Sequence, residues 1–128
     1  MFNDARNTYL SSSIGTASPE RLLVMLCDRM VLDIERALAM QEAADFTTAH
    51  QHLVHAQDVV AELNSSLRVD LWAGAAALQA LYNHLHTQLV QANIHRDLEA
   101  TQHCLALARD LATTWREAAA SAVQAAVG

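Results

Sequence analysis

The chain has 128 residues, of which 52% are hydrophobic, and a formal net charge of −6. Its length fits one domain spanning residues 1–128, which can bury a hydrophobic core without disulfides or metals. All eight basic residues are arginines, scattered among fourteen acidic residues. Because they form no basic stripe, we expect neither nucleic acid nor an anionic membrane as the partner.

The cysteines and the N-terminal residues indicate the cellular compartment. Cys27 and Cys104 are too few for a tetrahedral zinc site and lack the pattern of a secreted disulfide framework, so we predict two buried free thiols. Residues 1–15 contain no apolar signal-peptide core, and no stretch approaches 18 uninterrupted apolar residues. The sequence therefore predicts a cytoplasmic protein without membrane insertion.

Residues 1–15 contain Tyr9, Leu10 and Ile14 among Asn, Ser and Thr. These are too few to hold a helix alone but enough to dock weakly on a surface. We predict a mobile N-terminal segment that covers part of the domain and is displaced when a partner binds.

The first helix is predicted to begin near Ser18 and to run to about residue 42. Ser18 can cap free amide groups, and Pro19 suits the first helical position, where its missing N–H has no intrahelical partner to lose. On a helical wheel the apolar residues span about 200°, about twice the width that one core-facing stripe requires. They are Leu22, Leu23, Val24, Leu26, Cys27, Met30, Val31, Ile34, Ala37 and Leu38.

Met25 and Leu32 fall on the far side of this first helix, one heptad apart, and form a small second apolar strip. The charged residues predicted to flank the strip are Asp28 and Glu35 on one side and Arg29, Asp33 and Arg36 on the other. Two interpretations of the wide apolar arc remain open. Either the N-terminal segment and two neighbouring helices cover it, or part of it is a groove for another chain.

The second helix is predicted to begin after Asp45, which suits a cap. Its apolar residues recur three and four positions apart, which is the spacing of a bundle seam. They are Phe46, Ala49, Leu53, Ala56, Val60, Leu63 and Leu67. We place Val59 and Leu63 at the edge of the groove as candidate partner-binding residues.

Two further helices are predicted to open at Asp70 and at Asp97. The third carries Leu78, Leu81, Tyr82, Leu85, Leu89 and Ala92 on one face, and the fourth carries Leu98, Cys104, Leu105, Ala108, Leu111, Ala112 and Trp115. Tyr82, Leu89 and Asn93 are candidate partner contacts. The alternative is that Tyr82 and Leu89 belong to the core and that Asn93 marks the end of the helix. Residues 118–128 form an alanine-rich extension that is expected to fray.

Short connections force neighbouring helices to run antiparallel. The sequence therefore predicts an all-α fold, an antiparallel up-and-down four-helix bundle with a short N-terminal covering segment. The sequence predicts no catalytic site and no metal site. No histidine has a glutamate three residues before it, as a di-metal bundle requires, and no glycine-rich loop or nucleophile elbow is present. We expect no enzyme activity, no metal and no cofactor.

Four segments and one upstream residue form a combined pattern: TASPERLLVMLCDR (16–29), AQDVVAELNSSLRVD (56–70), LQALYNHLHTQLVQANIHRD (78–97), LATTW (111–115) and Tyr9. Together they resemble the flagellar secretion chaperones of the FliS family, which usually have a tyrosine where this chain has Tyr9. The resemblance covers about residues 9–117. The sequence departs from the family pattern at Cys27, where an aromatic residue is usual, at Arg29, where glycine is usual, and at Trp72 in a loop without Gly-Gly.

This resemblance implies a cytosolic export chaperone. Such a protein binds the disordered C-terminal segment of flagellin, prevents its premature polymerisation and delivers it to the flagellar type III export gate. The candidate partner-binding residues are Tyr9, Leu10, Ile14, Met25, Leu32, Val59, Leu63, Tyr82, Leu89 and Asn93. The alternative from the residues alone is an adaptor or regulatory bundle that binds another folded helical protein or a second copy of itself.

Overall fold

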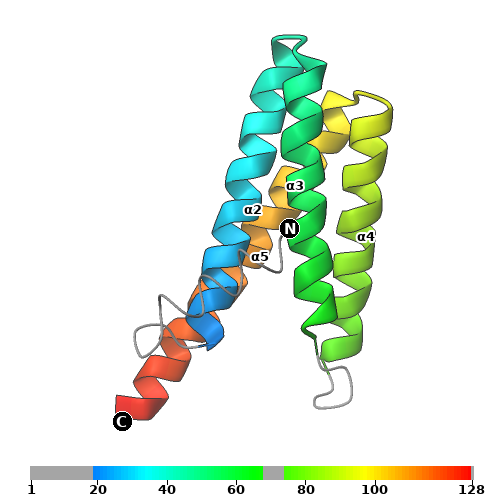
Figure 1. Ribbon diagram of the computed structural model, residues 1–128. Helices are drawn as coiled ribbons and strands as arrows, with labels where there is room; N and C mark the ends of the chain where they lie inside the picture. The colour runs from blue at the N-terminus through cyan, green and yellow to red at the C-terminus, as the bar shows by residue number, and fades with distance from the viewer. Residues whose placement is uncertain (1–18, 68–73, 128) are drawn as a thin grey trace.

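The structure, a computed structural model, describes residues 19–67 and 74–127, with side chains up to Ser121. These residues form four helices and no strand. The helices are α2 (Pro19–Glu42), α3 (Phe46–Ser65), α4 (Ala75–Ile94) and α5 (Leu98–Val127) (Figure 1). The predicted all-α fold is confirmed for this part of the chain.

Each helix runs antiparallel to the one before it (Figure 1). Helix α2 packs against α3 and α5, and α4 packs against the same two helices from the other side. The four helices thus close a ring around one core, which confirms the predicted up-and-down bundle. Every helix has two helical neighbours and one outward face.

The turns after α2 and after α4 have the same backbone geometry. Ala44 and Arg96 adopt left-handed φ angles of 58° and 51°. The next residue in each turn, Asp45 or Asp97, donates its N–H to the carbonyl five residues earlier, at 2.8 and 3.0 Å. This is the Schellman ending, in which glycine is the usual left-handed residue. A side chain there costs about 1–2 kcal/mol, so the short turns must be held by the packing around them.

The same two aspartates cap the helices that follow. The carboxylate of Asp45 accepts the Thr48 N–H and that of Asp97 accepts the Ala100 N–H, both at 3.2 Å. The hydrogen bonds from Thr48 also hold the pKa of Asp45 below its usual value. One residue thus ends each turn and starts the next helix, and both predicted caps are confirmed.

Two predicted helix boundaries differ from the structure or lie outside it. Helix α4 begins at Ala75 with Gly74 as its N-cap, so the prediction that Asp70 opens this helix is wrong. Glycine is tolerated at an N-cap but is unfavourable inside a helix, which favours a start after Gly74. Ser18 and Asp70 lie outside the described residues. The backbone of α5 is helical through Val127, and the fraying of residues 118–128 stays a prediction.

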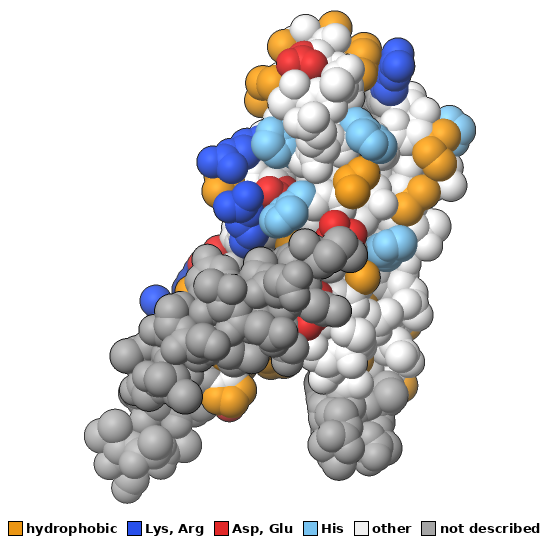
Figure 2. Space-filling model, in the orientation of Figure 1, with side chains coloured by type: hydrophobic (Ala, Val, Ile, Leu, Met, Phe, Trp, Pro, Cys, Tyr) orange, Lys and Arg blue, Asp and Glu red, His pale blue; other side chains and the backbone are white. Residues whose placement is uncertain are grey.

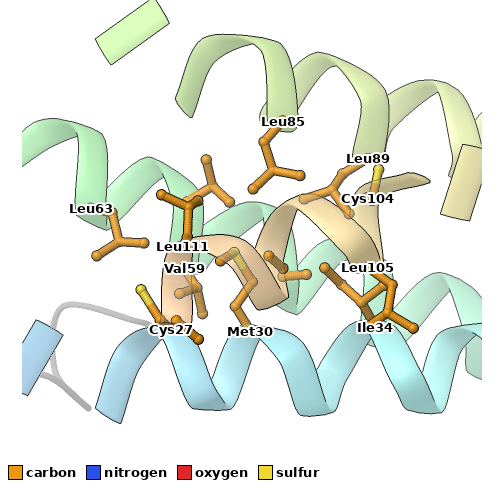
Figure 3. Close-up of a cluster of buried hydrophobic side chains, with 14 of the residues drawn as sticks. Cys27, Met30, Ile34, Val59, Leu63, Leu85, Leu89, Cys104, Leu105 and Leu111 are labelled. Atoms are coloured by element: carbon orange, nitrogen blue, oxygen red, sulfur yellow. The ribbon is translucent and has the colours of Figure 1, made fainter. Parts of the chain in front are cut away.

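The core is built from side chains of all four helices (Figure 3). Met30 and Ile34 of α2 and Leu85 and Leu89 of α4 enter the core from opposite sides, and all four are 0% exposed. Burying a side chain of this size contributes about 1.5–3 kcal/mol. The repeating apolar positions therefore account for the cohesion of the bundle.

The two cysteines are free and buried, as predicted. Figure 3 shows Cys27 on α2 and Cys104 on α5 among the core side chains. Burial raises the pKa of each thiol to about 12. Because the thiolate is the reactive form, these residues serve as small apolar core groups.

Candidate functional site

The apolar arc of α2 is wider than its two neighbours can cover. Val24, Cys27, Met30, Ile34 and Ala37 are buried. A second set is only half-buried, and it consists of Leu22, Leu23, Met25, Leu26, Val31, Leu38 and Met40. Leu32 is 38% exposed. Leu23, Leu26, Val31 and Leu38 pack against the core, so the apolar surface that α2 leaves outside it consists of Leu32 and the half-buried Leu22, Met25 and Met40.

We define the α2 strip as Met25 and Leu32, the pair predicted from the heptad spacing. Leu32 is exposed and Met25 is half-buried. Salt bridges to α5 line one side of the strip, where Arg116 Nη2 lies 2.7 Å from Asp28 and Arg109 Nη2 lies 3.6 Å from Glu35; all four side chains are about half exposed. Such exposed pairs add little stability, and here they orient α2 against α5.

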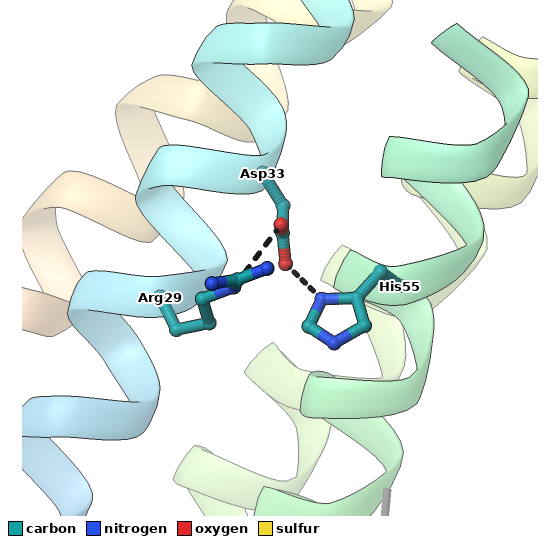
Figure 4. A network of polar contacts seen from close by, with 3 residues as sticks. All are labelled: Arg29, Asp33 and His55. Atoms are coloured by element: carbon teal, nitrogen blue, oxygen red, sulfur yellow. Dashed lines mark hydrogen bonds and ion pairs between the residues drawn. The ribbon is translucent and has the colours of Figure 1, made fainter. Parts of the chain in front are cut away.

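The other side of the strip is formed by a polar network between α2 and α3. Asp33 is only 1% exposed, and its carboxylate contacts the imidazole Nδ1 of His55 and lies 3.4 Å from Arg29 Nε (Figure 4). Asp33 was predicted to flank the strip together with Arg29 and Arg36, and the structure adds that its side chain is buried. A buried carboxylate needs a compensating partner, and the position of His55 across the α2–α3 contact supplies one.

Arginine and histidine side chains gather over α2 and α3, with small apolar areas between them (Figure 2). A contiguous apolar area with a charged rim on a protein surface is typical of a partner-binding site. Among the described residues, no group of three or more His, Cys, Asp or Glu side chains is placed to hold a metal ion.

Comparisons with known proteins agree on one family. The family model described as flagellar protein FliS matches residues 1–122. The chain belongs to the FliS family.

Three curated relatives are flagellar secretion chaperones of this name. The chain is 29% identical to the FliS of Bacillus subtilis strain 168, over 86% of this chain and 82% of that protein. It is 29% identical to the FliS of Escherichia coli K12, over 84% and 81%, and 26% identical to that of Salmonella typhimurium LT2, over 84% and 82%. The family resemblance predicted from the sequence is confirmed.

A solved structure has the same fold. It is described as a flagellar chaperone from bacteria, with a TM-score of 0.74 and 16% identity, and the match covers 94% of this chain and 99% of that one. At this identity the likeness concerns the fold alone. None of the helices in the described part of this FliS-family chain is long and apolar enough to cross a membrane.

Four of the candidate partner-binding residues are core residues. Val59 and Leu89 are 0% exposed, Leu63 is 2% exposed and Tyr82 is 1% exposed. Val59 and Leu63, which we placed at the edge of the groove on the second helix, are buried in the core of this structure. Both side chains point into the bundle (Figure 3). They lie on the side of α3 that packs against α2 and α4.

Tyr82 is held at the core boundary. Its hydroxyl accepts a hydrogen bond from the half-buried Trp115 Nε1 at 3.4 Å, and burial raises the pKa of Tyr82 to about 12. Asn93 is half-buried near the end of α4 and is hydrogen-bonded to His50 Nδ1 at 2.8 Å. Tyr9, Leu10 and Ile14 lie outside the described residues.

The turn end of the bundle contains a hollow that the sequence did not indicate. It has a volume of about 380 Å³, and its lining includes Gln41, Phe46, Asn93, Ile94 and Arg96. Ile94 is 65% exposed, and the Arg96 guanidinium lies 4.6 Å from the centre of the Phe46 ring. The lining residues come from two turn regions that are far apart in sequence, residues 41–50 and 93–96, so periodicity within one helix gives no signal for the hollow.

Proposed function

We propose that this FliS-family chain binds the disordered C-terminal segment of flagellin in the cytoplasm, prevents its premature polymerisation and delivers it to the flagellar type III export gate. Family membership supports an export-chaperone role. The observation that carries the finer proposal is the surplus apolar surface of α2, centred on Leu32.

The chemistry of this surface suits a helical client. Leu32 and the half-buried residues of α2 offer apolar area. The ion pairs beside them lie at the surface, so this apolar area is separate from the core. An amphipathic segment that is disordered alone can lay its apolar stripe into such an area and become helical there. Its own polymerisation surface would then be covered.

Calorimetry with a peptide of the flagellin C-terminal segment tests the proposal. We expect binding with a negative heat-capacity change and a gain of helicity in circular dichroism, because apolar surface is buried and a disordered segment folds. Leu32→Glu should weaken binding at least tenfold while leaving the bundle folded, since residue 32 is already exposed.

Ile94→Glu is the matched control. Ile94 is also an exposed large apolar residue, but it lies at the end of α4 and away from the α2 strip. We expect this variant to bind like the unaltered protein. Equal losses in both variants would mean that general surface hydrophobicity, and not the α2 strip, governs binding. Absence of binding to the unaltered protein would contradict the proposal itself.

A further inference from the structure

Two histidines from neighbouring helices face each other on the surface of the bundle. His84 of α4 and His103 of α5 are both exposed, and their Nε2 atoms lie 3.4 Å apart. Their ring centres are 5.7 Å apart and their ring planes cross at 81°. Because the ring centres are farther apart than the nitrogens, the two Nε2 atoms point toward one another.

This separation matches the bite of a tetrahedral metal ion. Zinc binds imidazole nitrogen at about 2.0–2.1 Å, which puts two ligands of a tetrahedral site about 3.3 Å apart. A square-planar copper site would bring adjacent nitrogens to about 2.9 Å, which fits the pair less well. We propose that His84 and His103 bind a zinc-class divalent metal ion that links α4 to α5.

The two rings are available as ligands. Among the described residues, each imidazole ring contacts the other through its Nε2 atom. Both side chains project from long helices that pack against each other, so the scaffold holds the pair at this spacing. A small rotation of each ring turns both Nε2 lone pairs toward one metal ion, with a proton left on each Nδ1.

The site is an open one. No third His, Cys, Asp or Glu of the described residues joins the pair, so water fills the remaining positions. The expectation of no metal rested on the spacing of histidine and glutamate within one helix. A pair formed across two helices, 19 residues apart, has no such spacing.

Titration of the metal-free full-length protein with zinc chloride in a calorimeter tests the proposal. We expect one zinc ion per chain at this site, and at least a tenfold loss of affinity in His84→Ala and in His103→Ala, because each removes one of two protein ligands. His86→Ala is the matched control, since it removes a histidine two residues away on α4 and leaves the pair intact; it should bind zinc like the unaltered protein.

Thermal unfolding supplies a second measurement. A metal that binds the folded state raises the melting temperature, on the order of 10 °C at about 100 times its Kd for a domain of this size. Zinc should raise the melting temperature of the unaltered protein and of His86→Ala, whereas it should leave His84→Ala and His103→Ala almost unchanged. Magnesium should have no effect on any of them, because it prefers oxygen ligands.

The opposing possibility is that the two rings form only an N–H···N hydrogen bond. In that case zinc affinity would be the same in all four proteins, and no variant would differ in its response to zinc. Either result overturns the proposal. The melting temperatures of the metal-free variants check that each variant folds, which we expect because the His84 and His103 side chains are exposed.

Discussion

The buried carboxylate of Asp33 predicts that its removal and the removal of its partner have unequal effects. Asp33 is 1% exposed, whereas the side chains of His55 and Arg29 are 39% and 51% exposed. Asp33→Asn leaves two side chains that water already reaches. His55→Ala leaves a carboxylate inside the α2–α3 contact, with only Arg29 Nε nearby at 3.4 Å. The second change should therefore destabilise the protein more.

The expected magnitudes follow from what is left unpaired. Breaking a fully buried ion pair costs about 3–5 kcal/mol, and the remaining Arg29 reduces this, so we expect about 2–3 kcal/mol for His55→Ala. Asp33→Asn loses a hydrogen bond to groups that can be rehydrated, which costs about 1 kcal/mol. In a domain of this size, 1 kcal/mol corresponds to about 3–5 °C in melting temperature.

Urea unfolding followed by circular dichroism on both single variants and the double variant measures these effects. His55 makes a further interaction, so the double-mutant cycle isolates the pair better than either single variant does. We expect the double variant to be more stable than the sum of the single effects predicts, by about 1–2 kcal/mol. Additive effects, or a larger loss in Asp33→Asn than in His55→Ala, would refute the reasoning.

Two further predictions concern the core. Leu85→Ala removes a side chain that is 0% exposed at the centre of the bundle and should lower the free energy of unfolding by about 3–4 kcal/mol, measured by urea denaturation. Burial raises the pKa of Cys27, Cys104 and Tyr82 to about 12, from usual values of 9.0 for the thiols and 10.0 for the phenol. The unfolded chain therefore ionises first, and the stability that these groups contribute is complete below about pH 9 and is lost as the pH rises toward 12. The urea midpoint should fall over this pH range, and above pH 10 it should fall less steeply in Tyr82→Phe than in the unaltered protein. Both thiols should react with a thiol reagent only after denaturation. A flat midpoint from pH 9 to 11 would contradict this linkage.

The fold could be predicted because its signals are local. Apolar spacing of three and four residues places Leu53, Leu85 and Leu105 inside the bundle, and an aspartate can cap a helix through its own side chain. Asp45 and Asp97 confirm this. Asp70 fails as the start of α4 although it is the same residue type, because Gly74 lies between it and the helix and is the residue that the structure uses as the cap.

The candidate site was less predictable because it depends on how helices cross. A helical wheel places Asp33 beside Arg29 and Arg36, on a row that looks exposed. The structure buries Asp33 because α3 approaches that flank of α2 and brings His55 to it. Val59 and Leu63 lie on the part of α3 that two neighbouring helices enclose together, so they are core residues and not edge residues. The His84 and His103 pair also exists only because α4 and α5 lie side by side.

The polar contacts of α2 have a consequence for the proposed client surface. A helix with apolar residues over about 200° can rotate to bury whichever part is most apolar, because burial has little directional preference. Asp33 with His55 on one flank, and Asp28 with Arg116 on the other, fix the rotation of α2 through directional contacts. Their net contribution to stability is small, but they leave Leu32 outward while Met30 and Ile34 face the core. Asp28→Asn combined with Asp33→Asn should therefore weaken the binding free energy of a helical client, measured by calorimetry, by more than it lowers the free energy of unfolding, measured by urea denaturation.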